Sequence, residues 1–197
     1  MAPDISREPS AQTEPSIQPE PTVPLITDRL RLRHYRPTDV EPLLTYYGDP
    51  GVARLLLDEP WDRDKAEQEV TRRSGKLHIT AEGFSIALVV EHEGNVIGDI
   101  ALWATDATLS LGEIGWVFHP DAGGRGFATE AARAVLELAF GHYRMHRVKA
   151  QLDARNTASA RMCERLGMTR EAHLRKDWFS KGEWTDTLVY GLLATER

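Results

Sequence analysis

The sequence predicts a single α+β domain with a mixed, curved sheet of about seven strands and helices on both of its faces. Three observations carry this prediction. Strand-like segments follow one another between Phe84 and Phe118, a long amphipathic helix follows a glycine-rich loop, and the C-terminal part alternates strand, helix, strand and strand. Grouped strands with helices inserted among them are typical of α+β domains.

The N-terminal residues differ in composition from the rest of the chain. Residues 1–23 are rich in Pro, Ser, Glu and Gln and contain no aromatic residue, so they cannot bury enough apolar surface to offset the entropy of ordering. We expect a flexible tail over 1–23 and a single domain over 24–197. The chain has 197 residues, 41% of them hydrophobic, which suits one core rather than two.

The first half of the domain is predicted to begin with a strand and two helices. Alternation over Leu30–Arg33 indicates a strand, and a short helix capped by Thr38 or Asp39 closes near Gly48. A second helical stretch runs from about residue 61 to residue 75. Three strand patterns separated by turns then predict an antiparallel meander, at 84–91, 96–103 and 111–118.

The second half is predicted to contain two helices and three strands. Apolar residues from Ala128 to Phe140 fall along one side of a helix. A strand follows at 147–154, and a capped helix begins at Asn156 and ends at Gly167. Two final strands, at 170–179 and 183–193, form a pair across the turn at 180–182.

Composition and charge exclude several classes of function. The net charge of −6 argues against a nucleic-acid-binding surface and suits a cationic acceptor. One cysteine allows no internal disulfide and no Cys-rich metal framework, and the seven histidines have no metal-binding spacing, so we expect no metal. No apolar run reaches about 18 residues and no signal pattern opens the chain, so we expect a cytoplasmic protein without a membrane partner.

Three glycines within four residues precede the amphipathic helix. Gly123, Gly124 and Gly126 leave the backbone uncovered and tolerate positive φ, so this loop can offer bare N–H groups. A helix N-terminus adds unpaired donors and the positive end of its dipole, which favours a phosphate or diphosphate group. No Gly-Lys-Ser/Thr follows, which excludes a P-loop, and Thr129 breaks the dinucleotide-binding pattern. A glycine-rich turn without a ligand is the alternative interpretation.

Residues 124–128, GRGFA, come directly after the strand-like GEIGWVFHP and resemble motif A of the GNAT superfamily of acyl-CoA-dependent N-acyltransferases. Gly123 stands where that motif usually has Gln or Arg. The likeness runs from about Leu25 to the C-terminus, because further motifs recur in the same order, and it is greatest for the ribosomal-protein N-terminal acetyltransferases. The resemblance implies the GNAT fold, acetyl-CoA as donor, and direct transfer of an acetyl group to a primary amine, either a protein N-terminus or a small-molecule amine.

The resemblance also implies which residues bind acetyl-CoA. Backbone N–H groups of a splayed strand would polarise the thioester carbonyl, and the glycine loop with the start of the helix would hold the diphosphate, with added charge from Arg125. Asn156 matches the residue that contacts the pantetheine arm, and it also fits a helix N-cap. Ser159, one turn later, would face the same side. The cofactor-binding set is Trp116, Val117, Phe118, Gly123, Gly124, Arg125, Gly126, Phe127, Ala128, Thr129, Asn156 and Ser159.

An ammonium acceptor must lose a proton before it can attack, so a general base is needed near the acceptor. Glu113 is the first candidate, because it lies on the predicted strand 111–118 where several GNAT enzymes carry a catalytic glutamate. A carboxylate that merely faces water is the alternative. Weaker candidates for the base are Asp99, His173 and Asp177.

The departing thiolate also needs a proton. GNAT enzymes often supply it from a tyrosine at the position that Cys163 occupies in this chain. We expect the Cys163 thiol to pack in the core, as free cysteines usually do, which leaves Ser159 or solvent as the proton donor. Trp103 and Trp178 fit either the core or the wall of an acceptor groove.

The leading hypothesis is therefore an acetyl-CoA-dependent N-acetyltransferase that exists as a monomer or a homodimer. Gly123 and Cys163 depart from the family pattern, so an acyl-CoA-binding sensor or scaffold without turnover is the alternative. A nucleotide-binding regulatory domain is a third hypothesis. The identity of the acceptor has no readable code in the sequence.

Overall fold

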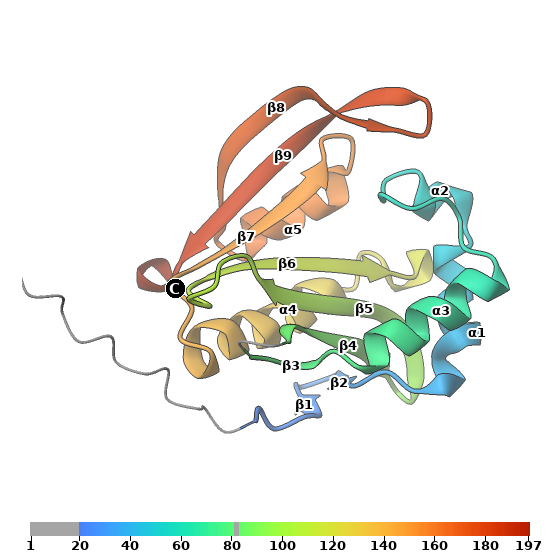
Figure 1. Cartoon of the computed structure of the whole chain (residues 1–197), viewed down its shortest axis with the longest axis horizontal. Helices are drawn as coiled ribbons and strands as arrows, with labels where there is room; N and C mark the ends of the chain where they lie inside the picture. The colour runs from blue at the N-terminus through green and yellow to red at the C-terminus, as the bar shows by residue number, and fades with distance from the viewer. Residues whose placement is uncertain (1–19, 81–82) are drawn as a thin grey trace, which may run out of the picture.

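The computed structural model describes residues 20–80 and 83–197. Within these ranges the chain forms a nine-stranded sheet in the order β1-β2-β4-β5-β6-β7-β9-β8, with β3 paired to β4 outside that path (Figure 1). The strands are β1 (Leu25–Ile26), β2 (Arg31–Arg33), β3 (Leu77–Ile79), β4 (Phe84–His92), β5 (Asn95–Ala104), β6 (Leu111–Phe118), β7 (Arg147–Asp153), β8 (Thr169–Ser180) and β9 (Glu183–Leu193). The α-helices are α1 (Val40–Tyr47), α2 (Pro50–Ala53), α3 (Arg63–Ser74), α4 (Phe127–Glu137) and α5 (Thr157–Arg165).

The sheet is mixed, as predicted. Neighbouring strands are antiparallel except β6 and β7, which are parallel, and the predicted meander is β4, β5 and β6. The described residues form nine strands rather than about seven, because β1 with two residues and β3 with three are too short to show an alternating pattern. The four-residue helix α2 is missing from the sequence prediction for the same reason.

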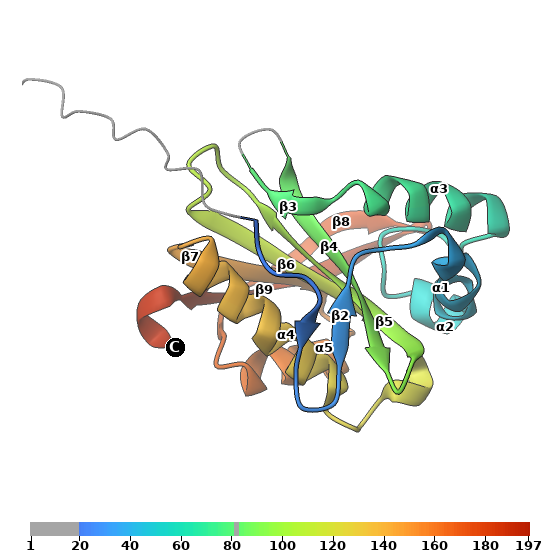
Figure 2. The ribbon, with the colours of Figure 1, turned by 90° about the horizontal axis from the view of Figure 1, so that it is seen from below.

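Strand β4 is buried on both faces, which explains its nearly continuous apolar sequence. Consecutive side chains alternate between two cores. Ile86 and Val90 pack in the core that contains α4 and α5, whereas Val89 packs in a second core with α1 and α3. Figure 2 shows α4 and α5 crossing the face of the sheet that is turned toward the viewer. The prediction of helices on both faces is confirmed.

Caps and turns end several elements where the sequence predicts. Asn156 caps α5, since its Oδ1 accepts a hydrogen bond from the Ser159 N–H, and Gly167 follows that helix with a φ of 81°. Helix α4 begins at Phe127, one residue earlier than predicted. Strands β8 and β9 form a hairpin across Lys181 and Gly182.

The predicted tail, residues 1–23, lies outside the described residues except for positions 20–23. Val23 packs against the core that contains α4 and α5. Within residues 20–80 and 83–197, no helix is long and apolar enough to cross a membrane.

Candidate active site

Strands β6 and β7 diverge along their length. They pair near their N-terminal ends, and the last pair joins Glu113 to Lys149. Strand β6 nevertheless stays paired with β5 as far as Phe118. The edge of β6 from Ile114 to Phe118 therefore faces a gap between the two strands, which we call the β6–β7 opening. This is the splay that the resemblance implied and that the sequence alone could not show.

The pairing of β5 with β6 determines which N–H groups face this opening. The His119 N–H donates to the Ile97 carbonyl at 2.9 Å, so every second residue back along β6 also directs its N–H toward β5. Val117 is one of these residues. Trp116 and Phe118 direct their N–H groups the other way, into the opening. Two of the three predicted carbonyl-polarising N–H groups are therefore available there, and the N–H of Val117 is not.

Three predicted cofactor-binding residues meet on the α5 side of the opening. The Trp116 indole Nε1 donates to Ser159 Oγ at 3.2 Å, and Asn156 Oδ1 accepts from the Ser159 N–H at 3.0 Å. Asn156 and Ser159 are both half-buried. The Asn156 amide N–H groups and the Ser159 hydroxyl proton are left for a ligand in the opening.

The glycine-rich loop leads into the N-terminus of α4. Gly124 and Gly126 have φ values of 72° and 81°, which residues with side chains rarely adopt. A Cβ at Gly123 would lie 2.9 Å from the Pro120 carbonyl oxygen, so the Gln or Arg of motif A does not fit there without a shift. The intrahelical hydrogen bonds begin where the Glu130 N–H donates to Gly126 O at 3.0 Å. The N–H groups without an intrahelical acceptor are those of Phe127, Ala128 and Thr129.

Phe127 and Thr129 can offer a ligand their backbone groups but not their side chains, because these side chains are buried. Two arginines stand over the Phe127 ring, with the guanidinium carbon of Arg125 at 4.5 Å and that of Arg29 at 4.6 Å from the ring centroid. Arg29 also donates to the Arg125 carbonyl at 3.0 Å and forms an ion pair with Glu130 at 2.6 Å. Arg125 adds a cation to the positive end of α4, whereas the charge of Arg29 is balanced by its ion pair with Glu130.

Arg29 was missed by the sequence analysis. It lies on the turn between β1 and β2, 96 residues before Arg125, and no motif spacing relates the two positions. The pairing of Arg29 with Glu130 on the first turn of α4 brings it to the loop, and a contact of this kind has no local sequence signal.

Glu113 lies at the inner end of the β6–β7 opening. Its carboxylate accepts from Gln151 Nε2 at 3.1 Å and lies 3.2 Å from Lys149 Nζ, and 14% of its side chain is exposed. Since successive side chains of a strand alternate, Glu113 lies on the face of the sheet opposite to the Trp116 indole. Trp103, its partner on β5, lies on the same face as Glu113. We call this face the acceptor side, and the face with Asn156 the cofactor side.

Asp99, a weaker candidate for the base, is a structural residue. It is 4% exposed and accepts from Tyr35 Oη at 2.6 Å, from Tyr47 Oη at 3.0 Å and from Arg73 Nη1 at 2.6 Å. Burial and the charge of Asp99 raise the pKa of both tyrosines well above its usual range, so their hydroxyls stay protonated and donate. This network uses both oxygens of Asp99 and ties α1 and α3 to β5.

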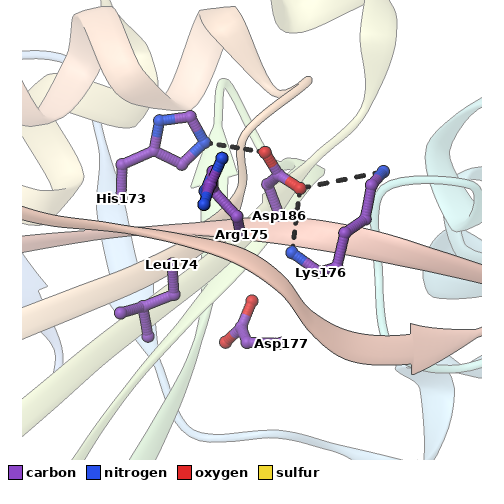
Figure 3. Close-up of a pocket in the computed structure, with 6 residues that line it drawn as sticks. All are labelled: His173, Leu174, Arg175, Lys176, Asp177 and Asp186. Carbon is purple, nitrogen blue, oxygen red and sulfur yellow. Dashed lines mark hydrogen bonds and ion pairs between the residues drawn. The ribbon is translucent and has the colours of Figure 1, made fainter.

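His173 and Asp177, the other weaker candidates, line a separate cavity of about 630 Å³ beside the irregular part of β8 (Figure 3). His173 Nε2 lies 2.8 Å from Asp186 Oδ2. His173 is paired with Leu188, whose side chain packs in the core that contains α4 and α5. His173 therefore lies on the opposite face of the sheet from Glu113 and does not share the acceptor side.

The Cys163 thiol packs in the core, as expected. It is fully buried, and burial raises its pKa to about 12. Its side chain has no exposed surface from which it could reach a ligand in the opening. The Ser159 hydroxyl, half-buried beside the Trp116 indole, lies on the cofactor side.

No group of three or more His, Cys, Asp or Glu side chains that could hold a metal ion is found in the described part of the chain. The loop and the opening fit one elongated thioester ligand instead. The start of α4 suits a diphosphate, Asn156 and Ser159 suit an amide-containing arm, and the N–H groups of Trp116 and Phe118 suit a carbonyl oxygen.

Comparison with known proteins identifies the family of the chain. Residues 29–169 match the family described as acetyltransferase (GNAT) domain. The uncharacterized N-acetyltransferase YnaD of Bacillus subtilis is 30% identical over 172 residues, which cover 87% of this chain and 98% of that protein.

Solved structures share the fold along most of the chain. A GNAT-family acetyltransferase from Bacillus anthracis has a TM-score of 0.79 and 28% identity, covering 87% of this chain and 99% of that one. Spermidine N-acetyltransferase from Vibrio cholerae, solved with CoA and spermine, has a TM-score of 0.73 and 19% identity over 86% and 98% of the two chains. RimL, a ribosomal L7/L12 alpha-N-protein acetyltransferase solved with CoA, has a TM-score of 0.76 and 16% identity over 86% and 97%. The chain belongs to the GNAT family, and it is an acetyl-CoA-dependent N-acetyltransferase.

Proposed function

We propose that the enzyme transfers the acetyl group of acetyl-CoA directly to the nitrogen of a primary amine in the β6–β7 opening. The observation that carries this proposal is the convergence of Trp116, Asn156 and Ser159 on the cofactor side, with Glu113 on the acceptor side of the same opening. Direct transfer requires donor and acceptor to meet in a fixed geometry, and the opening joins the two faces of the sheet.

The glycine loop and the first turn of α4 hold the diphosphate of the donor. Their N–H groups and the helix dipole favour an anion, Arg125 adds positive charge, and Arg29 donates to the Arg125 carbonyl. Asn156 holds the pantetheine arm through its amide. Acetyl-CoA supplies the activated thioester, whose carbonyl carbon the amine attacks.

The N–H groups of Trp116 and Phe118 polarise the thioester carbonyl. Negative charge develops on its oxygen in the transition state, and donors that are already fixed stabilise this charge without reorganisation. The pairing of β6 with β5 holds both N–H groups in place.

Glu113 removes the proton from the incoming ammonium group, directly or through one water molecule. Lys149 and Gln151 contact its carboxylate from β7 and hold it in place at the inner end of the opening.

The departing thiolate takes up a proton through Ser159, whose hydroxyl hydrogen-bonds to it and regains its own proton from solvent. Its oxygen already accepts from the Trp116 indole, so the hydroxyl proton points away from that ring and is available to a second acceptor.

The acceptor is a primary amine, either a protein N-terminus or a polyamine. The names of two proteins with the same fold support both classes, one an alpha-N-protein acetyltransferase and the other a spermidine acetyltransferase. The net charge of −6 favours the approach of a cationic acceptor. The single buried thiol of Cys163 fits our proposal that the enzyme works in the reducing cytoplasm.

Release of the CoA thiol from acetyl-CoA tests this proposal. The acceptors are peptides that begin with Ser, Ala, Thr or Met, lysine peptides, polyamines and aminoglycosides. We expect turnover with one of these classes, and a rate about 100-fold lower for Glu113→Gln at unchanged acetyl-CoA affinity.

Glu171→Gln is the matched control, because Glu171 is also an ion-paired carboxylate, bonded to Arg147 of β7. Its rate should equal that of the wild type. An unchanged rate in Glu113→Gln would remove Glu113 from the mechanism, and binding without thiol release from any amine would favour a sensor.

A further inference from the structure

Two segments far apart in the sequence meet at the end of the molecule where β6 and β7 have diverged. The turn of the β8–β9 hairpin carries Lys181, whose Nζ donates to Ala53 O at 2.9 Å and to Leu56 O at 2.5 Å. Ala53 ends α2, and Leu56 lies in the connection from α2 to α3. Figure 1 shows α2 and the hairpin tip at the same end of the molecule. We call these two hydrogen bonds the Lys181 bridge.

The backbone conformation at Lys181 indicates that lysine stands at this position because of its side-chain contacts and not because of the turn. Lys181 has a φ of 51° and Gly182 a φ of 79°, so both central residues of the hairpin turn are left-handed. Such turns favour Asn or Gly at the first position, because a β-carbon there strains the backbone. Lysine is a poor choice for this conformation, and its side chain is the part that contacts α2.

The carbonyl groups at the bridge suit a cation. Carbonyl oxygens at the C-terminal end of a helix carry partial negative charge. Ala53 O already accepts from the Leu56 N–H at 2.9 Å, and Lys181 adds a charged donor to it. A charge-assisted hydrogen bond is stronger than a neutral one, so this contact can hold a short, irregular segment in place.

A second set of charges ties the same elements together. Arg155 forms ion pairs with Asp153 at 2.7 Å and with Glu183 at 2.6 Å, which joins the end of β7 to the hairpin. Arg54, next to Ala53, interacts electrostatically with both of these carboxylates. The α2–α3 connection, the end of β7 and the hairpin therefore converge beside the β6–β7 opening.

We propose that Lys181 is a positioning residue for the acceptor. The Lys181 bridge holds the α2–α3 connection across the acceptor side of the opening, so that an amine reaches Glu113 through an enclosed entrance between α2 and the hairpin. This inference rests on the proposed function. Lys181 then affects the KM for the acceptor, and it takes no part in binding acetyl-CoA or in the chemical step.

The test compares Lys181→Asn with Lys176→Asn in the full chain. Asparagine tolerates the left-handed conformation, but its side chain is too short to reach the carbonyl oxygen of Ala53. Lys176 has a φ of 52°, and its Nζ donates to Trp184 O within the same hairpin, so its replacement relieves similar backbone strain without breaking a contact to α2. Lys181→Arg is the conservative variant, which keeps a charged donor.

The first readout is amide hydrogen exchange of residues 54–60 in the free enzyme. The Leu55 and Leu56 N–H groups donate to Val52 and Ala53, and their exchange should become about tenfold faster in Lys181→Asn. The second readout is steady-state kinetics with the best amine of the acceptor panel. The acceptor KM should rise about tenfold in Lys181→Asn at unchanged acetyl-CoA KM, and Lys181→Arg should restore most of it.

Unchanged exchange in Lys181→Asn would overturn the proposal, and so would a raised acetyl-CoA KM or an equal effect of Lys176→Asn. Faster exchange at an unchanged acceptor KM would also overturn it, since the segment would then not define the acceptor entrance. Absence of turnover in the wild type with every amine would refute the proposed function, and the exchange readout would still decide whether the bridge holds the segment.

Discussion

Gly126 and Gly167 share one backbone conformation but occupy different places, and this pair separates a role in cofactor binding from a role in folding. Both have a φ of 81°. Gly126 precedes the first turn of α4, whereas Gly167 follows α5, and a Cβ at Gly167 would meet nothing within 4 Å. Glutamate at either position should strain the left-handed backbone by about 1–2 kcal/mol.

The two substitutions should differ in their effect on acetyl-CoA. A carboxylate at Gly126 stands where we place the diphosphate, and two unit charges at about 4 Å repel by about 4 kcal/mol at an effective dielectric constant of ~20. The loop is exposed, so screening by solvent reduces this repulsion by half to about 2 kcal/mol, which weakens binding about 30-fold.

Titration calorimetry with acetyl-CoA, with thermal unfolding measured in parallel, tests this prediction. Both variants should lose a few degrees of Tm, and only Gly126→Glu should lose affinity. Equal affinity losses in the two variants would show that strain alone weakens binding. Retained affinity in Gly126→Glu would refute the assignment of the diphosphate to this loop.

Three further predictions concern the base and the charged networks. Glu113→Gln should lower kcat about 100-fold at unchanged acetyl-CoA affinity; an equal loss in Glu171→Gln would point to general destabilisation. Burial opposes ionisation of Glu69, but hydrogen bonds and charges from Arg72 and its neighbours outweigh burial and lower the pKa of Glu69 to about 2. The ionised carboxylate therefore stabilises the fold above the ordinary pKa of glutamate, and this stabilisation is lost as the pH falls toward 2. Urea unfolding should show about 3 kcal/mol less pH dependence for Glu69→Gln between pH 5 and 2, and parallel curves for the two proteins would contradict this. Asp99→Asn should cost about 3 kcal/mol in the same urea method, because the buried Arg73 keeps its ion pair with Glu69 at 3.2 Å but loses the shorter one to Asp99 at 2.6 Å. A cost under about 1 kcal/mol would mean that Glu69 and the tyrosines hold α1 and α3 without the charge of Asp99.

The order of the main elements could be predicted because long strands and amphipathic helices repeat their pattern several times. Strand β4 and helix α4 are of this kind. Strands β1 and β3 and helix α2 contain too few residues to show a hydrophobic repeat, and they depend on tertiary contacts for their stability.

Local residues of the site could be predicted in the same way, because the loop and the caps have short-range signals. Gly126 before α4 and Asn156 before α5 are examples. Arg29 and Lys181 act through contacts with residues about a hundred positions away, which leave no trace in spacing. The unavailable N–H of Val117 depends on the phase of the β5–β6 pairing, which three successive strand residues do not disclose.

Acetyl transfer to an amine in the β6–β7 opening is best tested by measuring acetyl-CoA binding and turnover on the same enzyme preparation. Acetyl-CoA is titrated calorimetrically, and thiol release and acetylated amine are then quantified with the best acceptor of the panel. We expect the wild type to bind acetyl-CoA and to release thiol and acetylated amine in equal amounts, and we expect Glu113→Gln to lose turnover while it still binds acetyl-CoA. Binding without thiol release from any amine, or turnover that survives in Glu113→Gln, would contradict it.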